Sequence, residues 1–134
     1  MKYTVYFVMI ILFLAGCDDD YYMEGYIKTV GVTEITEQSA VLNGEMEITT
    51  VGKEAQPNIV SRGFILQTLG MSDRTVKDNL GREGGFRLEV GDLGSNTKYR
   101  VKAFVTIEYN YDYNSSYYKK TDTFYGSIIE FTTQ

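Results

Sequence analysis

Five tyrosines lie close together near the C-terminal end of this 134-residue chain, and their side chains have the clearest capacity to bind a ligand. They are separated by Asn, Asp and Ser, the composition that antibody-like loops use to make rigid aromatic contacts with a polar rim. Tyrosine rings also stack on the flat faces of sugars. We therefore predict a ligand-binding loop over about 108–123, whose candidate residues are Tyr109, Tyr111, Tyr113, Tyr117 and Tyr118.

The same tyrosines allow a second interpretation. If the preceding strand continues into this segment, residues 109, 111 and 113 share one face of it, because successive side chains of a strand alternate in direction. Tyrosines that pack across a two-stranded ribbon stabilise exposed β structure without binding anything. Lys119 and Lys120 would then keep the end of the ribbon soluble. The sequence leaves both interpretations open.

The composition excludes most enzyme chemistry, because the chain has no histidine and only one cysteine. Nucleophilic catalysis of the Ser-His-Asp or Cys-His kind loses its base, and zinc loses its usual ligands. A carboxylate pair, as in glycoside hydrolases, is the remaining route, and a single small domain rarely holds a substrate between two acids. We expect no catalytic residues and no cofactor. The carboxylates that could lie near one end of the domain are Asp92, Glu108, Asp112 and Asp122.

Asn110, Asp112 and Asn114 are spaced like the start of a calcium-binding loop. A helix-loop-helix calcium site also needs Gly at its sixth position and Glu at its twelfth. This chain has Ser115 and Thr121 at those positions. We therefore expect no metal site of that type, and a looser surface calcium site at the first three residues is the alternative.

The N-terminal residues predict a secretion signal. Lys2 precedes an apolar segment from Val5 to Gly16, which is too short to span a membrane, since spanning takes roughly 20 apolar residues. The tetrapeptide that ends at Cys17 resembles a bacterial lipobox, in which the cysteine receives a lipid and the chain is cut before it. This implies a signal peptide over 1–16 and a covalent lipid at Cys17, so that the protein is anchored to a membrane. An ordinary signal peptide with a chance cysteine is the alternative.

An acidic cluster follows the cysteine directly, formed by Asp18, Asp19 and Asp20. It resembles the export signal that sends lipoproteins of some gut-type Gram-negative bacteria to the outer face of the outer membrane. That signal usually has Ser or Lys before the acids, which this chain lacks. The resemblance implies an outer-membrane protein that faces the cell exterior. The alternatives are that the protein faces the periplasm, or that the acidic cluster is a solvated spacer and not an export signal.

The rest of the chain has the pattern of an all-β domain. In 39–48, Ala40, Leu42 and Met46 are apolar and alternate with polar residues, which is typical of a strand with one buried face. The net charge of −5 argues against nucleic acid, whose phosphates need a basic surface. About seven short strands predict a two-sheet antiparallel β-sandwich. The expected strands lie at 27–35, 39–48, 58–68, 74–78, 85–90, 97–107 and 126–133.

The segment DLGSNTKYRVKAFV, from Asp92 to Val105, resembles the Leu-x-Pro-x-Thr-x-Tyr-x-Val-x-Ala pattern of fibronectin type III-like modules, which are immunoglobulin-like sandwiches. The resemblance implies a tyrosine corner, in which Tyr99 hydrogen-bonds back to the preceding turn and Leu93 lies beneath it. Ser95 replaces the usual proline. SRGFIL and YGSIIEFTT look like a variant common in lipid-anchored proteins of gut-type Gram-negative bacteria.

These observations predict a lipidated cysteine and short acidic tether at 17–25, followed by the module at 26–134. Asp18 to Gly25 reach at most ~28 Å, which keeps the domain close to its membrane. We expect a non-catalytic lipoprotein whose tyrosine-rich loop binds a glycan, or a membrane or host protein. A structural or accessory subunit of an outer-membrane assembly is the alternative, and a glycoside hydrolase is a remote one.

Overall fold

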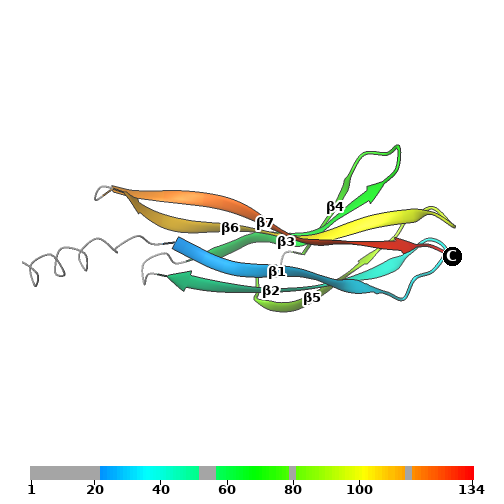
Figure 1. Cartoon of the computed structure of the whole chain (residues 1–134), viewed down its shortest axis with the longest axis horizontal. Helices are drawn as coiled ribbons and strands as arrows, with labels where there is room; N and C mark the ends of the chain where they lie inside the picture. The colour runs from blue at the N-terminus through cyan, green and yellow to red at the C-terminus, as the bar shows by residue number, and fades with distance from the viewer. Residues whose placement is uncertain (1–21, 52–56, 79–80, 114–115) are drawn as a thin grey trace, which may run out of the picture.

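Residues 22–51, 57–78, 81–113 and 116–134 are described by the structure, which is a computed structural model (Figure 1). For 22–24, 50–51, 111–113 and 116–117 the description covers the backbone only. The expected signal peptide 1–16, the lipidation site Cys17 and the cluster Asp18, Asp19 and Asp20 lie outside the described residues. Within the described part, no helix has the length and apolar character to cross a membrane.

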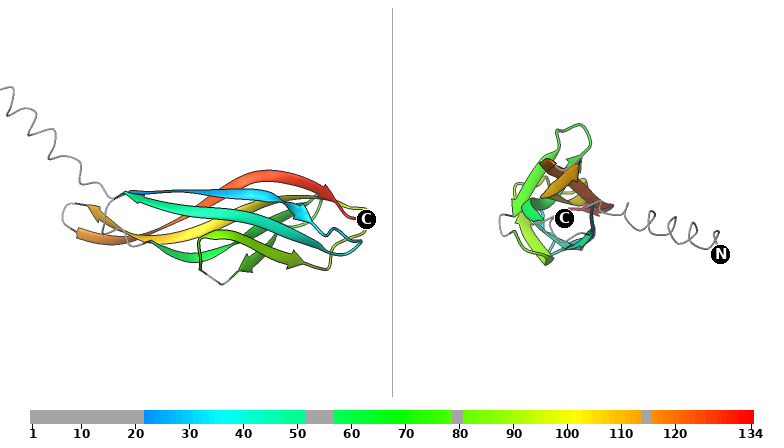
Figure 2. Two further views of the ribbon diagram at one scale, coloured as in Figure 1. Left: turned by 90° about the horizontal axis from the view of Figure 1, so that it is seen from below. Right: turned by 90° about the vertical axis from the view of Figure 1, so that its left-hand side faces the viewer.

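In the described ranges, seven strands form two antiparallel sheets, which confirms the expected all-β, two-sheet fold. One sheet has the order β1-β2-β5 and the other the order β4-β3-β6-β7. The domain is elongated along its strands (Figure 2). The strands are β1 (Tyr22–Thr33), β2 (Ala40–Val51), β3 (Asn58–Thr68), β4 (Arg74–Asp78), β5 (Gly84–Val90), β6 (Lys98–Tyr113) and β7 (Ser116–Thr132).

β1 begins earlier than expected. Residues 22–25 were assigned to the tether, and the structure pairs them with β2, from Tyr22 opposite Val51 to Gly25 opposite Ile48. The reason is the length of β2, whose ladder continues past the alternating apolar stretch and offers backbone partners to the residues before Tyr26. The part of the chain between Cys17 and the sheet is therefore shorter than predicted.

The core lies between the two sheets and includes the alternating apolar positions that the sequence predicts in β2. Ala40, Leu42 and Met46 of β2 are buried, and Phe64 of β3 meets Phe86 of β5 with ring centroids 5.1 Å apart. The inward positions of β6 complete it, namely Tyr99, Val101, Ala103, Val105 and Ile107. Burial of these apolar side chains is the main stabilising term, because the single cysteine offers no disulfide within the chain.

Gly63 is required where β3 meets β4. A Cβ at this position would lie 1.9 Å from the carbonyl oxygen of Val76 and 3.0 Å from the Cα of Lys77. Any side chain would therefore push the two strands apart. The glycine keeps the short strand β4 hydrogen-bonded to the sheet.

Thr29 of β1 joins the two sheets. Its side chain is buried, and Oγ1 donates a hydrogen bond to the carbonyl oxygen of Ser127 in β7 (2.5 Å) and accepts one from the N–H of Ala103 in β6 (2.9 Å). Gly126 makes room, since a Cβ there would lie 2.7 Å from Thr29 Oγ1. This contact fixes where β1 lies along β7.

Arg62 and Asp78 form a buried ion pair between β3 and β4. Arg62 donates from Nε (3.0 Å) and Nη2 (2.8 Å) to Asp78 Oδ2, and the two side chains are 3% and 7% exposed. The guanidinium also donates to the carbonyl oxygen of Arg82 and lies 4.7 Å from the ring centroid of Phe86. The pair therefore links β4 and β5 to the core.

We predict that Arg62→Ala lowers the free energy of unfolding by about 3–5 kcal/mol, because it leaves Asp78 buried without its cation. The matched control is Arg87→Ala, which breaks an ion pair with Glu34 whose side chains are 63% and 65% exposed. This control should cost less than about 1 kcal/mol. Urea denaturation measures both, and equal losses would contradict the assigned role of the buried pair.

Candidate functional site

The tyrosine-rich segment is a β-hairpin, which we call the tyrosine hairpin (residues 108–123). β6 and β7 pair from Glu108 opposite Thr121 to Tyr113 opposite Ser116. The prediction of a loop over 108–123 is therefore wrong for the backbone, and the ribbon interpretation describes it correctly. Tyrosine and threonine favour strands, and cross-strand pairing outweighs the turn preference of the intervening Asn and Asp. Residues 114 and 115, which separate the strand ends, lie outside the described part.

The register places the five candidate tyrosines on the ribbon. Tyr109 lies opposite Lys120, and Tyr111 lies opposite Tyr118. Tyr113 lies opposite Ser116, and Tyr117 lies opposite Asp112. Directly opposed residues share a face of an antiparallel pair, and alternate residues of one strand share a face. Tyr109, Tyr111, Tyr113 and Tyr118 therefore occupy one face of the hairpin, and Tyr117 occupies the other.

Tyr109 and Tyr118 have different environments. Tyr109 is 6% exposed, and its hydroxyl donates a hydrogen bond to Asp122 Oδ2 (2.7 Å). Burial, followed by this hydrogen bond, raises the pKa of the Tyr109 phenol above its ordinary value of 10.0. Tyr118 is 55% exposed. Tyr109 is thus part of the packed base of the hairpin, and Tyr118 presents its ring at the surface.

Two lysines sit beside the tyrosines on β7. Lys119 Nζ lies 3.4 Å from Glu108 Oε1, and Lys120 Nζ lies 3.8 Å from Asp122 Oδ2. All four side chains are more than one-third exposed, so each pair contributes little to stability, about 0–1 kcal/mol. The Lys119 ammonium group, on a side chain that is 74% exposed, can therefore exchange Glu108 for another partner.

The carboxylates named as candidates are not brought together as a set. Asp92 lies in the connection before β6, and Glu108 lies ten residues beyond the start of that strand at Lys98, toward the other end of the domain. The expectation that Asp92 lies near Glu108, Asp112 and Asp122 is wrong, because β6 is a single long strand that separates them. Among the described residues, no group of three carboxylate or thiol side chains could hold a metal ion.

The calcium alternative concerned Asn110, Asp112 and Asn114. Asn110 and Asp112 lie two residues apart in β6, opposite Lys119 and Tyr117 of β7. Asn114 lies outside the described residues. The extended backbone between Asn110 and Asp112 differs from the tight turn of a calcium loop, in which successive ligands curl around one ion.

The end of the domain away from the hairpin contains the arrangement expected of a tyrosine corner. The Tyr99 hydroxyl accepts a hydrogen bond from the N–H of Gly94 (2.7 Å), and Leu93 is buried in the core. Tyr99 also stacks on Phe131 with ring centroids 5.5 Å apart. These contacts fasten the turn before β6 to the last strand, and their role is structural.

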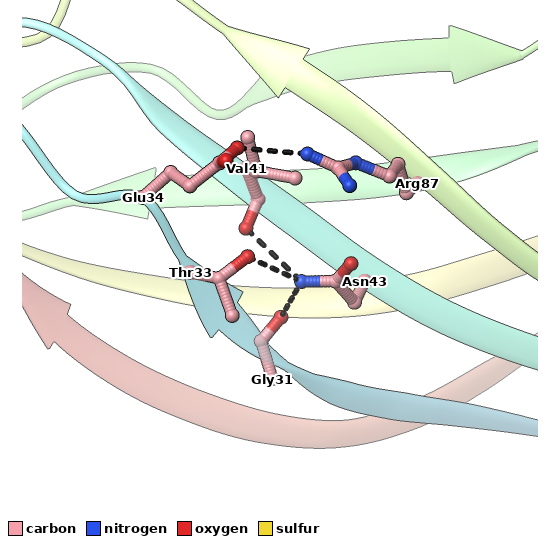
Figure 3. Close-up of polar contacts among 6 residues, drawn as sticks. All are labelled: Gly31, Thr33, Glu34, Val41, Asn43 and Arg87. Atoms are coloured by element: carbon pink, nitrogen blue, oxygen red, sulfur yellow. Dashed lines mark hydrogen bonds and ion pairs between the residues drawn. The ribbon is translucent and has the colours of Figure 1, made fainter.

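A shallow depression on the outer face of the three-stranded sheet was missed by the sequence analysis. It has a volume of about 530 Å³ and lies where Gly85 faces Glu45 without a side chain to fill the space. Asn43 is held there by Thr33 Oγ1 (3.0 Å) and the carbonyl oxygen of Gly31 (3.4 Å) (Figure 3). Arg87 is held by Glu34 (2.7 Å). The paired glycines Gly84 and Gly85 were the available sequence signal.

No family model matches this chain, and no curated protein matches it. Solved structures with a similar fold include two of the sensor domain of the anti-sigma factor RsgI4 in Pseudobacteroides cellulosolvens. One has a TM-score of 0.52 and 18% identity, covering 81% of this chain and 93% of that one. The other, a solution structure, has a TM-score of 0.51 and 17% identity, covering 82% and 75%. At this identity the likeness extends to the fold alone.

Tyr109→Phe tests the packed base of the hairpin. We expect a loss of about 1 kcal/mol in the free energy of unfolding near neutral pH, because the hydrogen bond to Asp122 disappears. Since the Tyr109 pKa is raised in the folded state, the unfolded chain releases this proton first, and wild-type stability should fall as the pH rises above about 10.

The variant should show a smaller fall over the same range, since Phe carries no ionisable proton. Urea denaturation at several pH values between neutral and alkaline measures the two slopes. Identical slopes would contradict the buried, hydrogen-bonded phenol at Tyr109.

Proposed function

We propose that this protein is a lipid-anchored, non-catalytic module of a Gram-negative outer membrane that binds a glycan or protein partner through the tyrosine hairpin. The observation that carries the proposal is the hairpin itself. Among the described residues, the ladder between β3 and β6 ends at Asn58 opposite Glu108, and the ladder between β6 and β7 continues from there to Tyr113 opposite Ser116. The hairpin therefore extends past the rest of the sandwich (Figure 1).

We also propose that the sandwich is fibronectin type III-like. Three- and four-stranded sheets in the orders β1-β2-β5 and β4-β3-β6-β7 are what such a module requires. The contact between Tyr99 and Gly94 supplies the tyrosine corner. A rigid sandwich of this kind is a suitable base for a projecting binding element.

The outer-membrane location, facing the cell exterior, and the lipid at Cys17 are supported by the N-terminal sequence. The absence of histidine supports a non-catalytic role. Glu108 and Asp122 are each paired with a lysine, which makes a glycoside hydrolase built on them the weaker candidate. The RsgI4 likeness is to sensor domains, and sensing by binding is compatible with this proposal.

A structural or accessory subunit of an outer-membrane assembly is the second candidate. One observation favours it: the hairpin projects at the end where β1 begins (Figures 1 and 2). A partner that meets the hairpin must therefore come close to the anchored end of the chain. A subunit of the same membrane meets this condition more easily than a soluble ligand does.

Cys17→Ala tests the anchor. We expect the wild-type chain to begin at an acylated Cys17 and to be recovered with membranes, since acyl chains contribute about 0.8 kcal/mol per buried methylene to membrane binding. The variant should carry no lipid and should retain residues 1–16, because the cut before position 17 follows acylation of the thiol. Mass spectrometry of the N-terminus measures both outcomes, and a wild-type chain whose Cys17 carries no lipid would contradict the anchor.

Serine substitution of Tyr111, Tyr113, Tyr117 and Tyr118 tests the binding role. Tyr109 is left unchanged because it is buried. We expect cross-linking of the intact protein to its partner in cells to fall at least several-fold, since one aromatic hot-spot residue contributes about 2 kcal/mol or more, which is roughly 30-fold in affinity.

The matched control is Tyr125→Ser, which removes a tyrosine of similar exposure (53%) from the body of β7. Its cross-linking should stay at the wild-type level. Binding of the purified domain to free glycans favours the first candidate. Cross-linking to one membrane protein without any soluble ligand favours the accessory subunit. Unchanged cross-linking in the four-tyrosine variant would contradict the role of the hairpin.

A further inference from the structure

β1 and β7 run side by side in the same direction. Thr29 contacts Ser127 through its hydroxyl, and further along the N–H of Gln134 donates to the carbonyl oxygen of Thr36 (3.1 Å). The offset between the partners is the same at both contacts, since 127 − 29 and 134 − 36 both equal 98. The start of β1 and the turn of the tyrosine hairpin therefore lie toward the same end of the domain (Figures 1 and 2).

The stretch of chain before Thr29 and the stretch before Ser127 can also reach equally far from the contact between these two residues. Cys17 precedes Thr29 by 12 residues, and Ser115 precedes Ser127 by 12 residues. An extended chain covers at most ~3.6 Å per residue, so Cys17 can lie at most ~43 Å from Thr29. A strand covers ~3.3 Å per residue, so the stretch from Ser116 to Ser127 in β7 covers ~36 Å. Cys17 can therefore lie at most a few ångströms beyond the level of the hairpin turn when the domain stands upright on its anchor.

We propose that the tyrosine hairpin contacts the lipid headgroup layer of the membrane that holds Cys17, and so gives the domain a second point of contact with that membrane. This inference rests on the proposed lipid anchor and names the surface that the hairpin meets. A membrane surface at the level of Cys17 is within reach of the hairpin. A partner of the proposed function would then meet the hairpin in this layer, which a glycan or protein of the same membrane can do.

The chemistry of the hairpin suits this layer. Tyrosine is enriched at membrane–water interfaces, because its ring is apolar and its hydroxyl can remain hydrated. Four of the five tyrosines lie on the last pairs before the turn, at Tyr111, Tyr113, Tyr117 and Tyr118. Membrane β-barrels place aromatic residues at the same depth for the same reason.

The charges near the turn also fit. Lys119 and Lys120 lie opposite Asn110 and Tyr109, whereas their partners Glu108 and Asp122 lie further from the turn. Long lysine stems can follow apolar surface and bring the ammonium group to lipid phosphates. Asp112 is the one acid of this group nearer the turn than the lysines. The tyrosines therefore carry most of the proposed contact, and the lysines assist.

The mature lipoprotein in vesicles of phosphatidylethanolamine and phosphatidylglycerol tests the proposal. Acylation leaves no free thiol at Cys17, so Ser116→Cys can be labelled with an environment-sensitive fluorophore beside the hairpin turn. Ser72→Cys, in the exposed β3–β4 connection at the other end, is the matched control. We expect quenchers attached to lipid headgroups to quench the Ser116 label several-fold more than the Ser72 label.

Serine substitution of Tyr111, Tyr113, Tyr117 and Tyr118 should bring quenching at Ser116 down to the level of the Ser72 control, and Tyr125→Ser should leave it unchanged. Vesicle flotation separates this proposal from the anchor. A protein that floats with vesicles but shows equal quenching at both labels overturns the hairpin contact alone. A protein that does not float overturns the anchor as well. Quenching that appears only in native membranes identifies a membrane protein as the partner and also overturns the lipid contact.

Discussion

The arrangement of the whole domain depends on the hydrogen bonds of one buried threonine. Thr29 Oγ1 donates a hydrogen bond to a backbone carbonyl of β7 and accepts one from a backbone N–H of β6. One side chain of the first sheet therefore completes the hydrogen bonding of the second. The ladders break at that level, with register shifts between Thr29 and Gly31 in β1 and between Lys102 and Phe104 in β6. A buried backbone N–H without a partner would be costly, and the hydroxyl satisfies it. The same contact, together with the hydrogen bond from the N–H of Gln134 to the carbonyl oxygen of Thr36, keeps β1 aligned with β7.

Period-two alternation was enough to predict the all-β class, the two sheets and most of the core, because a half-buried strand must alternate wherever it lies. The burial of Ala40, Leu42 and Met46 follows from local sequence alone. Thr29 could not be recognised in this way, since its partners lie 74 and 98 residues away along the chain. The buried pair of Arg62 and Asp78 is hidden for another reason: charged residues are mostly exposed, so the local sequence gives no sign that these two are buried.

The tyrosine hairpin shows a further limit of prediction from local sequence. Asn110, Asp112 and Ser116 are residue types that favour turns, so a prediction from local sequence places a loop here. Their ribbon conformation comes from pairing with the facing strand, where Tyr111 meets Tyr118 and Tyr109 meets Lys120. Strand preference is decided by the neighbour across the ladder more than by the residue itself. The environment of Tyr109 likewise depends on the facing strand, where Asp122 accepts its hydrogen bond. Tyr109 is buried and Tyr118 is exposed, although the two look equivalent in the sequence.

The length of β1 has a mechanical consequence. Its ladder with β2 runs from Tyr22 opposite Val51 to Thr33 opposite Val41, along the long axis of the domain. Hydrogen bonds of an antiparallel ladder lie perpendicular to the strands. A force that pulls Tyr22 away from Gln134 at the far end therefore shears these bonds together, whereas a sideways pull would open them one after another. The domain is built to bear load in the direction in which a chain held at its N-terminal end would be pulled.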